Sequence, residues 1–408
     1  MATISFQDMA FTKEEKGLNV MLYKLYTFTI PEDELESMGS YAVEDAHTLN
    51  FPGMKQEKAE RRFSQLIAKH IPDLRLAMNN VPARYIHQAS GIPLMGTNYF
   101  GLVDRDTNII ELKPMTGCNL NCIYCSVDEG RRSSKVQNYI IEEEYLVEEF
   151  KKIVALKECD QIEAHIGGQA DPSLYARLPE LISDLQAIEE VKTISIDTNG
   201  VLLSGNRSYL DEILDAGLTR MNLSLNALDP EMAKRMAGTP YPVERVKALA
   251  AYVLSRIDLI IAPTLLPGVN EEEMPKIIEF AKSISTPKRE AKVRIQNFLR
   301  YPHGRNPVKP KDFEWFFSRL RQWERQHEVK LTMMDDDSFV FLKTRKIPKP
   351  MKKDEVVQVE LLMPGRRRGE MLGKARGRMV SLPGCRKLRG TVRARITRSK
   401  HNIFTAKV

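Results

Sequence analysis

Short β-branched runs alternate with longer amphipathic stretches through the middle of the chain, and this alternation restricts the folds that it can adopt. Six runs have the composition of strands: residues 108–113, 161–166, 191–197, 220–226, 258–262 and 292–297. The helical patterns between and after them cover residues 141–156, 174–190, 209–216, 230–236, 243–256, 271–285 and 310–326. Strands that alternate with helices predict a parallel sheet with right-handed crossovers. We therefore expect an α/β fold.

Polar side chains occupy one face of several of these strands. Asn222, Ser224 and Asn226 alternate with Leu223 and Leu225, for example. In a fully packed parallel barrel both strand faces are mostly apolar. Because buried polar groups need partners, the polar face predicts a barrel interior that holds a polar ligand. An antiparallel sheet with one solvated face is the alternative, and the intervening helices disfavour it.

The charge of the chain is unevenly distributed. The 408 residues include 61 Lys and Arg and 54 Asp and Glu, a net charge of +7. Residues 343–408 hold 20 of the basic and 4 of the acidic residues, a local net charge of +16, which leaves residues 1–342 at −9. Such segregation indicates a separate basic unit with a polyanionic partner.

These changes of character divide the chain into four expected parts. Residues 1–106 form an N-terminal extension without recognisable chemistry, in which 56–70 has helical periodicity. Residues 107–342 form the α/β body, 343–353 a basic linker, and 354–408 a glycine-rich unit with the short strands of a small β-barrel. No apolar run approaches the roughly 20 residues that span a bilayer, and no signal peptide is recognisable, so we expect a cytoplasmic protein without membrane contact.

Three cysteines stand close together after the first expected strand. Cys118, Cys122 and Cys125 have the spacing C-x3-C-x2-C. Three thiolates on one loop can each bind one iron of a cubane cluster, which leaves one iron open for a substrate or cofactor. Zinc is the rival interpretation, but zinc sites usually show paired cysteines or a histidine ligand, and no such partner lies nearby.

This spacing, with aromatic Tyr124 directly before the last cysteine, resembles the signature of the radical SAM superfamily and, more narrowly, an archaeal-type iron–sulfur oxidoreductase group. The resemblance implies a partial (β/α)6 barrel, a [4Fe–4S] cluster on the three cysteines and S-adenosylmethionine (SAM) as cofactor. It also implies that the open iron chelates SAM, and that one electron from the cluster releases a 5′-deoxyadenosyl radical that abstracts hydrogen from a substrate.

A second motif, Gly167-Gly168-Gln169-Ala170-Asp171-Pro172, follows the second expected strand. Family members usually have Gly-Gly-Glu-Pro here, with the carboxylate on the SAM ammonium group. Alignment on the proline gives that role to Asp171, and alignment on the glycines gives it to Gln169. We favour Asp171 because an anion is the better partner for an ammonium group. The alternative is a strand-to-helix turn with Asp171 near a helix N-terminus.

Further polar residues lie at the ends of later strands. Asp197 and Asn199 follow the third strand, Ser224 and Asn226 the fourth, and Gln296 the sixth. The carboxyl ends of strands are where open α/β sheets bind ligands. By the resemblance, these five residues are expected to contact SAM, together with Tyr124, Gly167 and Gly168.

The C-terminal unit resembles a TRAM domain, a small OB-like β-barrel found in several RNA-modifying enzymes. The matching stretch is 357–408, with glycine and arginine clusters at 364–369 and 373–378 and with Phe404 near its end. A basic barrel with an exposed aromatic residue can neutralise phosphates and stack on a base. Docking onto the acidic body is the alternative use of its charge.

Together these features predict a single-cluster radical SAM enzyme that modifies RNA, with tRNA as the expected substrate. Only Cys159 and Cys385 remain for a second cluster, which disfavours methylthiolation. The electron is then expected from an external donor of the ferredoxin or flavodoxin type. The alternatives are a radical SAM enzyme with a protein or small-molecule substrate, and a non-enzymatic RNA-binding protein with a structural metal site.

Overall fold

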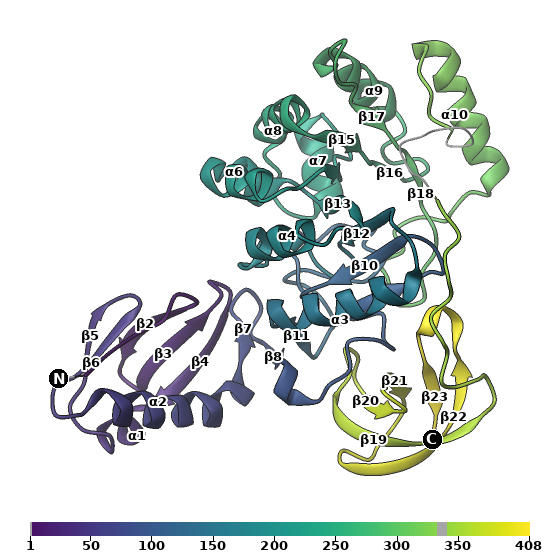
Figure 1. The fold of residues 1–408 in the computed structure, drawn as a ribbon. Helices are drawn as coiled ribbons and strands as arrows, with labels where there is room; N and C mark the ends of the chain where they lie inside the picture. Colours follow the sequence, from purple (N-terminus) through teal and green to yellow (C-terminus); the bar gives the residue numbers. More distant parts are fainter. Residues whose placement is uncertain (1, 333–340) are drawn as a thin grey trace.

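The computed structural model describes residues 2–332 and 341–408 (Figure 1). Its central sheet has seven strands in the order β17-β15-β14-β13-β12-β10-β9. All neighbours pair in parallel except β9, which is antiparallel to β10 at one edge. The strands are β9 (Gly101–Asp104), β10 (Ile109–Lys113), β12 (Ile162–Ile166), β13 (Val191–Thr198), β14 (Arg220–Leu223), β15 (Asp258–Ile261) and β17 (Lys292–Val293). The expected parallel α/β sheet is confirmed.

The last expected strand is divided into two. Only β17 joins the central sheet, and β18 (Gln296–Asn297) pairs in parallel with β16 (Thr264–Leu265). The helices between and after these strands are α3 (Glu143–Lys157), α4 (Leu178–Gln186), α5 (Val201–Ser204), α6 (Arg207–Asp215), α7 (Pro230–Ala237), α8 (Val243–Arg256), α9 (Glu273–Ile284) and α10 (Phe313–His327) (Figure 1). No helix in the described part of the chain has both the length and the apolar character needed to cross a membrane.

The N-terminal part is a β-rich unit whose strands the sequence pattern does not reveal. One sheet has the order β1-β6-β5 and another the order β11-β8-β7-β4-β3-β2. Their elements are β1 (Ala2–Ser5), β2 (Met9–Glu14), β3 (Gly17–Leu22), β4 (Tyr26–Pro31), α1 (Glu32–Glu36), β5 (Ala42–Asp45), β6 (Thr48–Phe51), α2 (Gln56–His70), β7 (Arg75–Leu76), β8 (Val81–Ile86) and β11 (Asn138–Ile141).

Two strands connect this unit to the body. β11 lies beyond the expected boundary at residue 106 yet pairs in parallel with β8, and β9 lies before that boundary yet belongs to the central sheet. The N-terminal unit and the body therefore share strand pairing rather than a simple linker.

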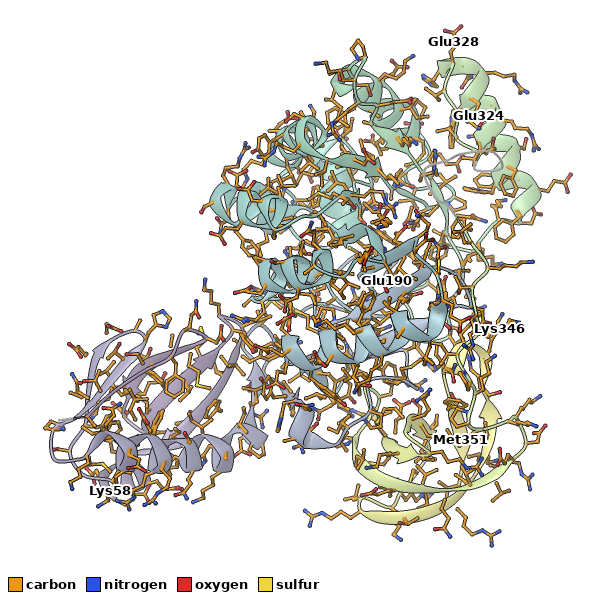
Figure 2. All side chains as sticks on the ribbon, in the orientation of Figure 1. Lys58, Glu190, Glu324, Glu328, Lys346 and Met351 are labelled. Atoms are coloured by element: carbon orange, nitrogen blue, oxygen red, sulfur yellow. The ribbon has the colours of Figure 1, made fainter. Side chains whose placement is uncertain are left out.

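The C-terminal part is a closed five-stranded barrel, so the expectation of a small β-barrel is confirmed at that level. Its strands are β19 (Val356–Pro364), β20 (Glu370–Ala375), β21 (Arg378–Pro383), β22 (Gly390–Arg398) and β23 (Thr405–Lys407). Met351 from the expected linker is buried in the barrel core; Figure 2 shows it among the barrel strands. Along β22, buried Val392, Ala394 and Ile396 alternate with exposed Arg393 and Arg395, the pattern of a strand with one face on a core.

The prediction of an exposed aromatic residue on the barrel is wrong. Phe404 is fully buried in the barrel core. It is the only Phe, Tyr or Trp among residues 354–408, and a small core gains more from burying its largest apolar ring than from exposing it. The barrel therefore offers no aromatic stacking face through Phe404.

Candidate active site

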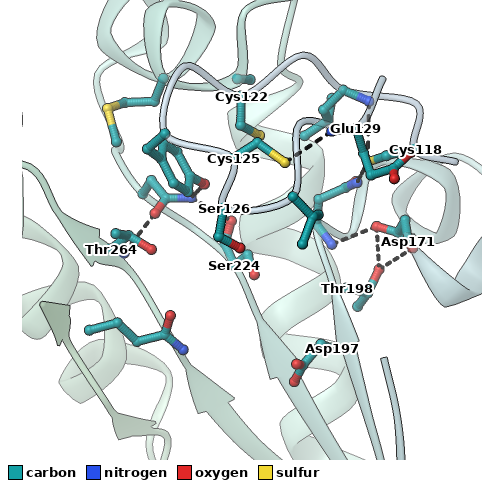
Figure 3. A pocket seen from close by; sticks show the side chains of 18 of the residues that line it. Cys118, Cys122, Cys125, Ser126, Glu129, Asp171, Asp197, Thr198, Ser224 and Thr264 are labelled. Carbon is teal, nitrogen blue, oxygen red and sulfur yellow. Dashed lines mark hydrogen bonds between the residues drawn. The ribbon is translucent and has the colours of Figure 1, made fainter. Parts of the chain in front are cut away.

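One loop carries the three clustered cysteines, and it lies between β10 and β11. Cys118, Cys122 and Cys125 are half-buried and line one cavity at the carboxyl ends of the parallel strands (Figure 3). Other residues predicted for the site line the same cavity: Tyr124, Gly168, Asp171, Asp197, Asn199, Ser224, Asn226 and Gln296. Gly167 and Gln169 are not among the lining residues; Gln169 is buried, and its backbone carbonyl accepts a hydrogen bond from the Gly117 amide at 3.2 Å.

Amide groups point at two of the sulfurs. The Glu129 backbone N–H donates to Cys125 Sγ at 3.2 Å, and the Leu120 N–H donates to Cys118 Sγ at 3.5 Å. Burial raises the pKa of the Cys122 thiol to about 12 and also raises the pKa of the other two cysteines. Buried thiolates of this kind are stabilised by a bound metal cation, and amide donors to the sulfurs tune the potential of an iron–sulfur cluster.

The donor set fits a cubane cluster. Within the described ranges, no three His, Cys, Asp or Glu side chains are close enough together to share a single metal ion. A cubane cluster does not need that geometry, because each thiolate binds its own iron. Three sulfurs that face one cavity, with amide donors behind two of them, match such a cluster.

Tyr124 fastens the cysteine loop to the sheet. Its hydroxyl accepts a hydrogen bond from Asn226 Nδ2 at 2.6 Å, and Asn226 Oδ1 accepts from the Thr264 backbone N–H at 2.8 Å. Tyr124 and Asn226, both predicted for the site, are thus hydrogen-bonded to one another. Tyr241, which sequence reasoning missed, also lines the cavity and donates to the Asn199 carbonyl at 2.8 Å.

Asp171 connects two loops below the cavity. Its carboxylate accepts from the Ser173 amide at 3.0 Å, the Ser173 hydroxyl at 2.6 Å, the Thr198 hydroxyl at 3.0 Å and the Asn199 amide at 2.8 Å (Figure 3). Asn199 in turn donates through Nδ2 to Cys118 Sγ at 3.8 Å. The carboxylate therefore holds the loop after β13 against the cysteine loop. Its expected contact with the SAM ammonium group stays a prediction.

This geometry predicts the effect of replacing Asp171 with asparagine. The substitution places an amide NH2 against groups that are themselves donors, and leaving buried donors unpaired costs about 1–3 kcal/mol. We expect Asp171→Asn to lower the free energy of unfolding of the apoprotein by that amount and to weaken SAM binding. Chemical unfolding and a SAM titration measure the two effects, with exposed Asp160→Asn as the control. Unchanged values in both measurements would show that the carboxylate is not needed there.

The polar strand faces meet in a hydrogen-bonded chain that runs from buried Glu163 and Ser195 to the partly exposed Asp197. His165 lies between Ser195 Oγ at 2.8 Å and Asp197 Oδ2 at 3.2 Å, and the Ser195 hydroxyl donates to Glu163 at 2.8 Å. Arg220 forms an ion pair with Glu163. Burial lowers the pKa of His165, but Asp197 and Glu163 outweigh it, and the net shift is upward. Asp197, at the cavity, is thus the outer end of a hydrogen-bonded chain in which His165 can carry a proton.

Arg305, in the loop after β18, holds the cysteine loop in place. Its guanidinium donates to the Cys122 carbonyl at 3.0 Å, the Glu129 carbonyl at 2.9 Å and the Asp128 carboxylate at 2.8 Å. These contacts span 176 to 183 positions of sequence, so no local pattern could reveal them.

Comparison with known proteins identifies the class that this fold and site define. Residues 112–281 match the family model of the Radical SAM superfamily. The protein is a radical SAM enzyme, and its cofactors are a [4Fe–4S] cluster and SAM. The alternative of a non-enzymatic RNA-binding protein is therefore wrong.

A second comparison finds a relative that matches almost the whole chain. Uncharacterized protein MJ0103 of Methanocaldococcus jannaschii is 38% identical over 425 aligned positions, which cover 97% of this chain and 96% of that protein. The chain belongs to the same family as that protein. GTP 3′,8-cyclase of Chlorobaculum tepidum is 26% identical over 198 residues, 48% of this chain and 56% of the cyclase. Among solved structures, Streptococcus suis SuiB matches with a TM-score of 0.42 and 16% identity, over 80% of this chain and 70% of SuiB.

Proposed function

We propose that this enzyme modifies RNA, with tRNA as the substrate, and that the C-terminal barrel is a TRAM-type domain that holds the RNA. The observation that carries the proposal is a set of uncompensated cations on the barrel. Arg386, Arg389, Arg393 and Arg398 are exposed, and within residues 2–332 and 341–408 no carboxylate lies within ion-pair distance of them. The barrel contacts the body through Arg366, which pairs with Glu129, and these four arginines take no part in that contact. Free guanidinium groups suit phosphates.

The position of these cations supports the same proposal. The Gly384 amide, in the loop before Arg386, donates to the Gly369 carbonyl at 2.8 Å, in the turn that also carries Arg367. Arg367 contacts His303, two residues from Tyr301. Tyr301 lines the cavity and is 44% exposed. The sugar-phosphate backbone of a bound RNA can therefore run from the barrel to the cavity mouth. There Tyr301 can stack on a base, the role that was expected of Phe404.

The cofactor contacts are part of the proposal. Cys118, Cys122 and Cys125 hold the cluster, and the SAM contacts come from the lining residues Gly168, Asp171, Asp197, Asn199, Ser224, Asn226 and Gln296. When bound, the cluster and SAM supply one-electron cleavage of SAM and hydrogen abstraction from a substrate. The chain itself orients SAM through these polar groups and excludes water around the reacting centre.

Radical SAM enzymes need an electron donor, and we propose one of the ferredoxin or flavodoxin type, in the cytoplasm. Methylthiolation stays disfavoured. Cys159 packs beside the hydrophobic core and Cys385 is buried in the barrel core, and neither lines the cavity.

A nucleotide is the second candidate substrate, and the similarity to GTP 3′,8-cyclases favours it. The reconstituted enzyme separates the two candidates. Formation of 5′-deoxyadenosine should be stimulated by unmodified tRNA and not by GTP if RNA is the substrate. Stimulation by GTP alone would favour the nucleotide.

Mass spectrometry of RNA nucleosides tests the proposed function in the cell. We expect a modified nucleoside in tRNA of the parent strain that is missing from a deletion strain. A plasmid with the wild-type chain should restore it, and one with the Cys122→Ala variant should not. Identical nucleoside profiles in parent and deletion strains would contradict an RNA substrate.

A further inference from the structure

A buried ion pair joins the C-terminal barrel to the cysteine loop. Arg366 lies in the turn between β19 and β20 and is fully buried. Its guanidinium pairs with the Glu129 carboxylate and donates to Asn138 Oδ1 at 2.9 Å, while its backbone carbonyl accepts from the Val136 amide at 3.0 Å. Glu129 is itself buried. Among the basic residues of the barrel, Arg366 is therefore directed inward, toward the body.

Glu129 connects this ion pair to a proposed cluster ligand. Its backbone N–H donates to Cys125 Sγ at 3.2 Å, so the residue gripped by Arg366 also contacts a sulfur (Figure 3). On the other side, Arg305 donates to the Glu129 carbonyl at 2.9 Å. Glu129, whose N–H points at the sulfur, is thus held by the barrel through its side chain and by the body through its carbonyl.

Burial makes this contact sensitive to the loss of either partner. A buried ion pair adds little stability compared with apolar residues of the same shape, but removing one partner leaves an uncompensated charge at high cost. The pair therefore ties the geometry of the loop to the docked position of the barrel. An exposed pair in the same barrel, Arg376 with Glu355 at 2.6 Å, has no such consequence, because solvent screens it.

We propose that Arg366 is a positioning residue for the cluster, and that the C-terminal barrel completes the cluster site through the path from Arg366 to Glu129 to Cys125. The barrel then forms part of the cluster site, in addition to its proposed role in RNA binding. This inference rests on the proposed role of Cys125 as a cluster ligand, and it does not depend on the identity of the substrate.

Redox titration of the reconstituted full-length enzyme tests the electrostatic part. Glu129→Gln leaves the permanently charged Arg366 without its counter-charge beside the cluster, so the midpoint potential should rise relative to wild type. The double variant Glu129→Gln, Arg366→Met removes both charges, and its potential should return toward the wild-type value. A merely structural contact would not give this reversal. An unchanged potential in Glu129→Gln would overturn the proposal.

Cluster retention tests the positioning part. Groups that orient metal ligands typically change metal affinity by about 10- to 100-fold when they are removed. Arg366→Met should therefore lose iron to a chelator about 10- to 100-fold faster than wild type, and Arg376→Met should match wild type. Equal rates in Arg366→Met and Arg376→Met would contradict the inference. Full iron content in Cys125→Ala would instead show that the ligand assignment is wrong, and a failed RNA test would leave both measurements unaffected.

Discussion

Replacing Cys122 with alanine removes the cluster and all SAM cleavage. Cys122 lines the cavity with the two other motif cysteines, and Arg305 holds its backbone carbonyl. With two thiolates left, the donor set no longer fits the three-ligand cluster. After anaerobic reconstitution we expect about four irons per wild-type chain and almost none in the variant. Under reductant, 5′-deoxyadenosine should form only with the wild type.

The chain supplies a matched control for this experiment. Cys159 is also a free, half-buried cysteine, but it lies just before β12, outside the cavity lining. Cys159→Ala should retain full iron content and full SAM cleavage. Iron and activity that survive in Cys122→Ala, or that disappear equally in Cys159→Ala, would contradict the assigned ligands.

Neutralising four arginines of the barrel weakens RNA binding in a salt-dependent way. Arg386, Arg389, Arg393 and Arg398 are exposed and are the cations proposed to meet phosphates. Each phosphate contact contributes about 0.7 to the slope of log affinity against log salt for single strands. Changing all four residues to glutamine should therefore make this negative slope shallower by about 3. Binding of tRNA measured at several salt concentrations gives both slopes.

Four exposed basic residues of the N-terminal unit provide the control. Lys16, Lys55, Lys58 and Arg61 carry the same total charge, and Lys58 lies on α2, away from the barrel (Figure 2). Their replacement by glutamine should leave the slope near the wild-type value. Equal losses in both quadruple variants would mean that net charge, rather than the barrel, determines binding. Unchanged binding in the barrel variant would contradict the proposed RNA site.

Local periodicity was enough to predict much of the body. The helix Val243–Arg256 begins and ends where its apolar repeat predicts, as does Gln56–His70 in the N-terminal unit. The alternation of polar and apolar residues on the strands also predicted a polar interior, and Glu163, Ser195 and Asn222 are buried there. These features depend on spacings within one element, which the sequence displays directly.

Features that depend on distant partners could not be predicted in the same way. The pairing of β8 with β11 could not be predicted, because the two strands lie far apart in the sequence. Phe404 was expected at the surface because the unit was interpreted as a basic barrel with an exposed aromatic residue, but the needs of a small core decided its position. Arg366 stood in a run of arginines and was expected to meet phosphate, yet its partner Glu129 lies 237 positions away.

Electron paramagnetic resonance of the reduced enzyme, with and without SAM, tests the central claim most directly. Three cysteine ligands leave one iron open, so a single cluster per chain should give a signal whose shape changes when SAM binds. SAM labelled with 17O in its carboxylate should add a hyperfine coupling to that signal. A spectrum that SAM does not alter, with a fourth side chain on the cluster, would contradict the account.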